Sequence, residues 1–169
     1  MPARLLLAVA LAASSQAFGY PDASPWGAAN PSAEEACSSC HYDYDPVSES
    51  KALGIDGLPA EAVPGETYPV VVRMTGVDAT VSGFQLVASA GTFNSDDAAL
   101  EADGNAIRST SAAVNRGSVE WAFSWEPPGV PGGAVEMYLA VSAANDDQSP
   151  FGDTIHYRRF VIAVTDAAD

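Results

Sequence analysis

Histidine and cysteine are scarce in this chain, which has two of each among its 169 residues. A structural zinc site normally needs four Cys or His ligands, so zinc would require all four of these side chains at one metal. The sequence contains no G-x-S-x-G, no H-E-x-x-H and no glycine-rich phosphate loop, which are motifs of hydrolases and nucleotide-binding enzymes. A Ser-His-Asp site would depend on His156, because His41 belongs to another motif. These absences favour a protein that is not an enzyme.

Basic residues are also few: 7 Lys and Arg stand against 22 Asp and Glu, giving a formal net charge of −15. Such a charge repels nucleic-acid phosphates and anionic membrane surfaces, so we expect no nucleic-acid partner. It suits a basic protein partner or a protein that works in high salt. An acidic surface that only keeps the protein in solution is an equal alternative.

Long hydrophobic runs are limited to one, at residues 5–13. It follows Arg4 and precedes the small residues of 14–19, with cleavage after Ala17 or Gly19 both allowed, which is the pattern of a secretory signal peptide. A membrane span needs roughly 20 apolar residues, so an uncleaved anchor is the weaker alternative. The sequence therefore predicts a signal peptide at residues 1–19 and a mature chain without a membrane span, located in the periplasm, outside the cell or on its surface.

The two cysteines stand together in Cys37-Ser38-Ser39-Cys40-His41. This is the C-x-x-C-H spacing of covalent c-type haem attachment: each thiol adds across one vinyl group of a single porphyrin, and the histidine offers an axial ligand to the iron. Outside the cytoplasm a cysteine pair has a second common fate, a disulfide. The motif predicts one covalent haem c per chain, linked through Cys37 and Cys40 and ligated by His41.

A haem that only carries electrons usually has a second axial ligand. We expect His156 in that role, since it begins the last predicted strand on the face opposite Ile155. Met74 and Met137 are alternatives, although Met137 has the spacing of a core residue. A vacant sixth position is the remaining alternative.

Residues 20–51 predict an extended lead-in, with a helical turn at residues 32–37 capped by Ser32 and Glu35. Tyr42 and Tyr44 would lie close to the haem edge, and Asp43 with Asp45 falls short of a calcium motif.

After residue 51 the pattern changes to short alternating strands separated by Gly, Pro, Asn and Asp, which predicts an immunoglobulin-like antiparallel β-sandwich. The strands are expected at residues 67–74, 81–88, 118–125, 134–142 and 154–164. Residues 94–115 favour neither strand nor loop, and the aromatic residues of 121–125 are expected in the core.

Several landmarks follow one another in a familiar order. They are Cys37 to His41, Leu58-Pro59, Pro64 to Val70, Gly83 to Leu86, Trp121 to Trp125 with Pro127, Met137 to Ala140, Ala144-Asn145 and Gly152-Asp153. The chain resembles the bacterial exported domains related to the reelin amino-terminal (reeler) domain, often called choice-of-anchor V domains, over about residues 36–160. The resemblance implies an immunoglobulin-like sandwich on the cell surface or in the periplasm, and several such domains carry C-x-x-C-H before it. The chain departs from many of them in lacking an anchoring segment and a histidine near Ile107.

Together these features predict a signal peptide (1–19), a lead-in with the haem motif (20–51) and a reeler-like sandwich (52–165). The predicted function is that of an exported monohaem c-type cytochrome domain, which transfers one electron to or from a redox partner and turns over no substrate. The alternative is a non-redox surface or adhesion module with a Cys37–Cys40 disulfide. Haem sensing or peroxide chemistry at an open iron is a third hypothesis.

Overall fold

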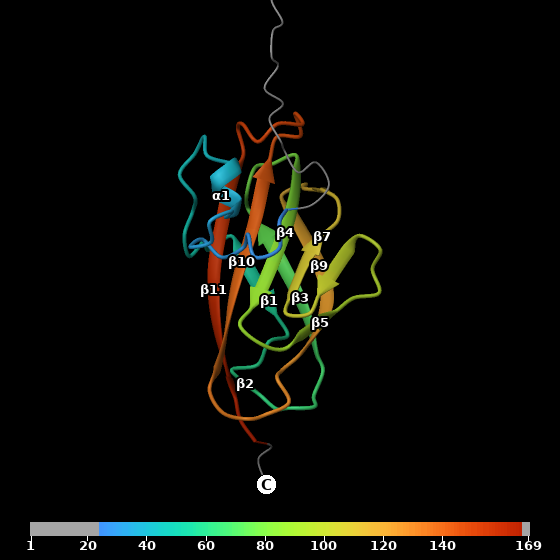
Figure 1. The fold of residues 1–169 in the computed structure, drawn as a ribbon. Helices are drawn as coiled ribbons and strands as arrows, with labels where there is room; N and C mark the ends of the chain where they lie inside the picture. Colours follow the sequence, from blue (N-terminus) through green and yellow to red (C-terminus); the bar gives the residue numbers. More distant parts are fainter. Residues whose placement is uncertain (1–23, 167–169) are drawn as a thin grey trace, which may run out of the picture.

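The computed structural model describes residues 24–166, so the predicted signal peptide lies outside the described residues. The described part forms one short helix and eleven strands (Figure 1). The elements are α1 (Cys37–Cys40), β1 (Leu53–Asp56), β2 (Glu61–Ala62), β3 (Tyr68–Thr75), β4 (Val81–Ala88), β5 (Thr92–Asn94), β6 (Leu100–Asp103), β7 (Ala106–Ser109), β8 (Ala113–Val114), β9 (Ser118–Glu126), β10 (Ala134–Ala144) and β11 (Thr154–Val164). No helix in this part of the chain is long and apolar enough to cross a membrane.

The strands form two sheets packed face to face. One has the order β1-β3-β9-β5, and the other has the order β2-β11-β10-β4-β7-β6, with β8 also paired to β4. All strand pairs are antiparallel except β2 with β11. The predicted all-β sandwich is therefore confirmed. Each of the five expected strands occurs, and β4 and β11 have the expected bounds; the undecided residues 94–115 contain β6, β7 and β8.

The core lies between the sheets and is rich in aromatic side chains. Alternation along β9 buries Trp121, Phe123 and Trp125, as expected for a strand with one face on the core. The ring of Phe84 on β4 lies 4.7 Å from that of Trp121 and 5.9 Å from that of Phe123, measured between centroids. The prediction that these aromatic residues form sandwich core is confirmed.

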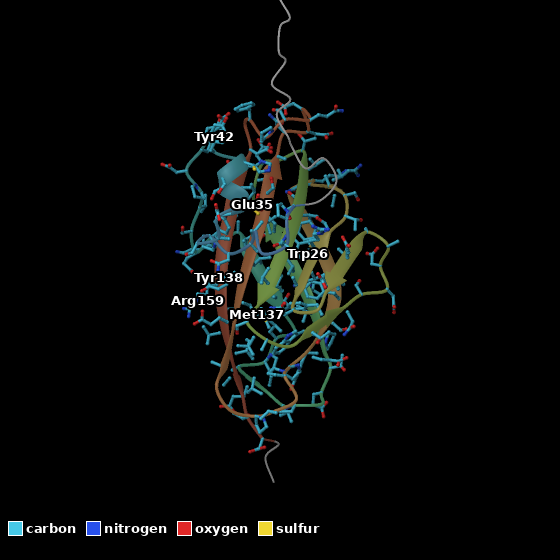
Figure 2. All side chains as sticks on the ribbon, viewed as in Figure 1. Trp26, Glu35, Tyr42, Met137, Tyr138 and Arg159 are labelled. Carbon is cyan, nitrogen blue, oxygen red and sulfur yellow. The ribbon has the colours of Figure 1, made fainter. Side chains whose placement is uncertain are left out.

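Residues 24–40, which we call the strap, cover part of the outer face of the larger sheet (Figure 1). The buried Gln85 of β4 accepts a hydrogen bond from the Ala29 N–H at 3.2 Å and donates to the Pro25 carbonyl at 2.8 Å. Trp26 packs on the guanidinium of Arg108 from β7, 3.9 Å from the ring centroid (Figure 2). The expected extended lead-in is thus a series of tight turns docked on the sheet by polar and aromatic contacts.

The helical turn predicted for residues 32–37 is wrong in position, since the helix begins at Cys37. Asn30, not Ser32, organises the preceding turns: its side-chain oxygen accepts the Ser32 N–H at 2.9 Å, and its carbonyl accepts the Ala33 N–H at 3.0 Å. The Cys37 N–H donates to the carbonyl of buried Ala28 at 3.0 Å. Docking of the strap therefore sets where the helix starts, and Ala36 precedes it without a side-chain cap.

Candidate functional site

The helix α1 gathers the C-x-x-C-H residues into one turn at the end of the strap. The His41 N–H donates to the Cys37 carbonyl at 3.1 Å, which closes the turn. The hydroxyl of Tyr157 on β11 accepts the Ser38 N–H at 3.0 Å and donates to the Ser38 hydroxyl at 3.2 Å. The turn is therefore fixed to β11 by a tyrosine 119 residues away in the chain.

The two thiols have different surroundings. Both are free, but Cys40 is exposed whereas Cys37 is partly buried and packs against the cluster of Ala29, Ala140, Ile155 and Tyr157. Burial raises the pKa of the Cys37 thiol to about 12, with a smaller contribution from Cys40. A low-dielectric environment disfavours the thiolate, so Cys37 is a protonated thiol at neutral pH.

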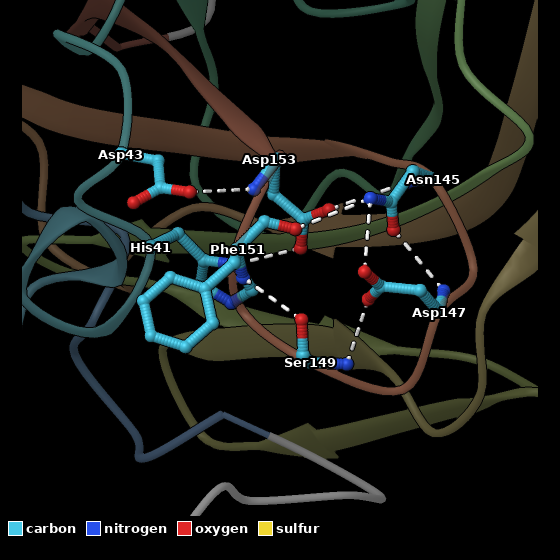
Figure 3. A network of polar contacts seen from close by, with 8 residues as sticks. His41, Asp43, Asn145, Asp147, Ser149, Phe151 and Asp153 are labelled. Carbon is cyan, nitrogen blue, oxygen red and sulfur yellow. Dashed lines mark hydrogen bonds and ion pairs between the residues drawn. The ribbon is translucent and has the colours of Figure 1, made fainter.

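His41 is held by a buried carboxylate. Its Nδ1 lies 2.8 Å from Oδ2 of Asp153, the residue that precedes β11 (Figure 3). The Asp153 side chain is 4% exposed and that of His41 is 29% exposed. The second Asp153 oxygen accepts the Asn145 N–H at 3.2 Å. Nε2 of His41 makes no hydrogen bond to any residue between 24 and 166, so the described chain engages only one of the two ring nitrogens.

The structure does not bring His156 to this turn. His156 pairs with Val141 in the sandwich core, whereas the next residue, Tyr157, faces the strap. Successive strand residues point to opposite faces, so His156 and Cys37 lie on opposite sides of the sheet. Nδ1 of His156 is hydrogen-bonded to the Ser50 hydroxyl at 2.8 Å, and burial lowers its pKa. His156 is 8% exposed, and Val47 and Ser50 of the chain before β1 contact it.

The segment that covers His156, residues 47–50, lies along the edge of β11. Val47 pairs with His156, its N–H donates to the Ile155 carbonyl at 2.8 Å, and the Ser50 N–H donates to the Tyr157 carbonyl at 2.9 Å. The serine of the resulting Ser50–His156 pair is 3% exposed, and among the described residues no carboxylate hydrogen-bonds this histidine.

Met74 and Met137, the other candidate ligands, are 0% exposed in the core between the sheets. Residues 24–166 contain no group of three or more His, Cys, Asp or Glu side chains placed to share a metal ion. The described residues therefore give no support to a cation site at Asp43 and Asp45. Instead, the Asp43 carboxylate accepts the Gly152 N–H at 3.0 Å and joins the motif segment to the loop before β11.

Exposed aromatic side chains lie next to His41. Tyr42 and Phe151 are 62% and 49% exposed and meet edge to face, with centroids 5.7 Å apart. Tyr42 lies beside α1 at one end of the sandwich (Figure 2), and Tyr44 is also exposed. The surface next to His41 is thus lined by exposed aromatic side chains.

Sequence reasoning missed Asp153, Asn145 and Tyr157 as parts of this site. In the sequence, Gly152-Asp153 and Asn145 stand out only as landmarks of the reeler-like order of motifs. Nothing in the local sequence links an aspartate to a histidine 112 residues earlier, and the contact arises only when β10 and β11 pair.

The arrangement of two packed sheets, antiparallel except for the short β2–β11 pair, defines an all-β two-sheet sandwich. Among solved structures, the reelin-N domain of F-spondin is similar: it is 18% identical, with 77% of this chain and 96% of that chain covered at a TM-score of 0.53. A fragment of the human F-spondin reeler domain is also 18% identical, with 72% and 92% covered and a TM-score of 0.48. No protein-family model and no curated protein matches the chain. The fold therefore resembles a reeler domain, and at this identity the likeness concerns the fold alone.

Proposed function

We propose that this protein is an exported monohaem c-type cytochrome domain that transfers single electrons. Cys37 and Cys40 would form the thioether links, and His41 would be an axial ligand of the iron. The single observation that supports this most strongly is the His41 side chain, which follows two free thiols in one helical turn and keeps Nε2 without a hydrogen-bond partner in the described chain while Asp153 holds Nδ1.

The donor set fits the chemistry of a c-type haem. Two free thiols are available to add to vinyl groups. A metal-bound histidine commonly donates its other ring N–H to a carboxylate, and Nδ1 of His41 lies 2.8 Å from a carboxylate oxygen of Asp153. Once bound, the haem supplies the one-electron couple. The buried, protonated state of Cys37 implies that attachment precedes docking of the strap on the sheet.

For the sixth position, the proposal assigns no residue among 24–166. His156 would have to leave Ser50 and the interior of the sandwich to reach the haem, and each methionine would have to leave a fully buried site. A vacant position accessible to solvent or to a small ligand agrees better with this placement. His156 as a metal ligand stays a prediction that the placement disfavours.

The partner proposed is a redox protein with a basic docking face. Residues 36–47 and 143–153 flank the His41–Asp153 contact; they contain four exposed aspartates, Asp43, Asp45, Asp146 and Asp147, and no lysine or arginine. Opposite charge would steer such a partner to the end where the haem is attached. The proposed location is the periplasm or the cell surface, on the basis of residues 1–19.

The test is to produce the protein in a host with c-type cytochrome maturation machinery. We expect the intact mass to increase by one haem and a reduced-minus-oxidised spectrum to show a c-type chromophore. The double variant Cys37→Ser, Cys40→Ser should lose both signals and keep the fold. A colourless protein with a mass lower by two hydrogens would overturn the proposal and favour the non-redox surface module with a Cys37–Cys40 disulfide.

A further inference from the structure

Asp153 is placed to do more than accept one hydrogen bond. It precedes the first residue of β11, and it is 3% exposed. Its Oδ1 accepts the Asn145 N–H at 3.2 Å, and its Oδ2 lies 2.8 Å from Nδ1 of His41. Both carboxylate oxygens are therefore engaged, each with a different partner.

The loop that carries Asp153 is held together by its own hydrogen bonds (Figure 3). The Asn145 side chain donates to the Phe151 carbonyl at 3.2 Å and to the Asp147 carboxylate at 3.2 Å. Asp147 in turn accepts the Ser149 N–H at 2.9 Å. A carboxylate positioned by such a loop has little freedom to follow the imidazole if the ring turns.

Gly152 lets this loop close against Asn145. Its φ is +83°, a left-handed conformation that favours glycine, and a Cβ here would lie 2.6 Å from the Asn145 side-chain nitrogen. The Gly152 N–H also donates to Asp43, two residues after His41. The loop and the motif segment are thus tied together at a second point besides the His41–Asp153 contact.

A carboxylate only accepts hydrogen bonds, so the proton between these groups belongs to the histidine. We propose that Asp153 is a positioning residue that selects the Nδ1–H tautomer of His41 and so gives Nε2 the free lone pair. This part is independent of haem. A second consequence rests on the proposed function: Asp153 would orient His41 as the axial ligand and strengthen the donation of its Nε2 lone pair to the iron, which would lower the reduction potential.

The tautomer can be measured without haem. We would record long-range ¹H–¹⁵N NMR spectra of the unloaded protein at pH 9, where histidine side chains are neutral. Wild-type His41 is expected to show the Nδ1–H pattern. An Nε2–H pattern in the wild type would overturn the inference without any variant.

The variant Asp153→Asn makes the test sharper. Because the Asn145 N–H still needs an acceptor, the amide oxygen should take that position and the amide NH₂ should meet Nδ1 of His41. The histidine would then switch to the Nε2–H tautomer. The control is Asp56→Asn on β1, which makes the same chemical change at the Arg73 ion pair and should leave the His41 pattern unchanged. An unchanged pattern in a folded Asp153→Asn protein would contradict the inference.

The loaded protein separates this inference from the proposed function. If no haem is found while the two tautomers differ as expected, the cytochrome proposal fails and the role of Asp153 stands. If haem is present, Asp153→Asn should raise the midpoint potential relative to Asp56→Asn. Equal potentials together with equal tautomers would refute the role of Asp153 and leave the cytochrome proposal intact.

Discussion

Removing one hydroxyl group, in the variant Tyr157→Phe, should make the thiol of Cys37 accessible. In the wild type the Tyr157 hydroxyl accepts the Ser38 N–H at 3.0 Å and donates to the Ser38 hydroxyl at 3.2 Å, from a residue that is 4% exposed. Without it, a partly buried N–H loses its partner. An unpaired N–H of this kind costs about 1–2 kcal/mol, and this cost destabilises the docked state of the strap relative to its open state.

The size of the effect follows from two steps. The pKa of Cys37 is about 12 against 9.0 for an ordinary thiol, so its thiolate at pH 8 is roughly 1000-fold rarer than in the unfolded chain. Alkylation in the folded protein should therefore occur mainly when the strap opens. Destabilising the docked strap by 1–2 kcal/mol should increase the open population and the alkylation rate about 5- to 30-fold.

The assay is alkylation by iodoacetamide at pH 8, followed by mass spectrometry, in a Cys40→Ser background that leaves Cys37 as the only thiol. The matched control is Tyr138→Phe, which removes a hydroxyl that donates to Glu136 at 3.0 Å on the sheet surface (Figure 2) and should leave the rate unchanged. The reasoning is refuted if folded wild-type Cys37 reacts as fast as it does in urea, or if Tyr157→Phe and Tyr138→Phe behave alike.

Three further predictions concern stability. Burial lowers the pKa of His156 in the folded state, so the unfolded chain, in which a histidine takes a proton below about pH 6.5, binds that proton more readily than the folded protein. The folded state therefore loses stability as the pH falls from 7.5 to 5, and His156→Gln should lose less in urea titrations; a difference between the two proteins that does not change with pH would contradict this. Gly91→Ala should destabilise by about 2 kcal/mol or more, because φ is +92° and a Cβ would lie 2.4 Å from Trp125 Nε1; an unchanged thermal midpoint would show that the turn adapts. Gln85→Leu should lower the free energy of unfolding by about 1–3 kcal/mol, because the Ala29 N–H loses its acceptor. Amide hydrogen exchange should become faster in the strap than elsewhere, which distinguishes local undocking of the strap from a general loss of stability.

Side-chain alternation was sufficient to predict the long strands of the sandwich. β9 and β10 bury every second side chain against the core, so their sequences carry the period of two that indicates a strand. β1 and β2 are four and two residues long, which is too short for a period to emerge. Their places depend on pairing with β3 and β11.

The strap and the site depended on contacts that the local sequence does not encode. The strap docks through Gln85 and Arg108, which lie on strands far along the chain. For His156, alternation correctly predicted a face opposite to Tyr157 but could not tell that both faces of β11 are covered. Asp153 was one of 22 acidic residues, and only the folded chain distinguishes it.

The order of the chain gives the buried position of Cys37 a consequence for timing. Its covering residues, Ala140, Ile155 and Tyr157, belong to the last two strands, more than 100 residues later. A polypeptide that emerges with its amino terminus first presents both thiols while β10 and β11 have not yet appeared. The interval between the arrival of the motif and the completion of the sheet is then a period in which an enzyme can modify the cysteines, and completion of the final hairpin closes it.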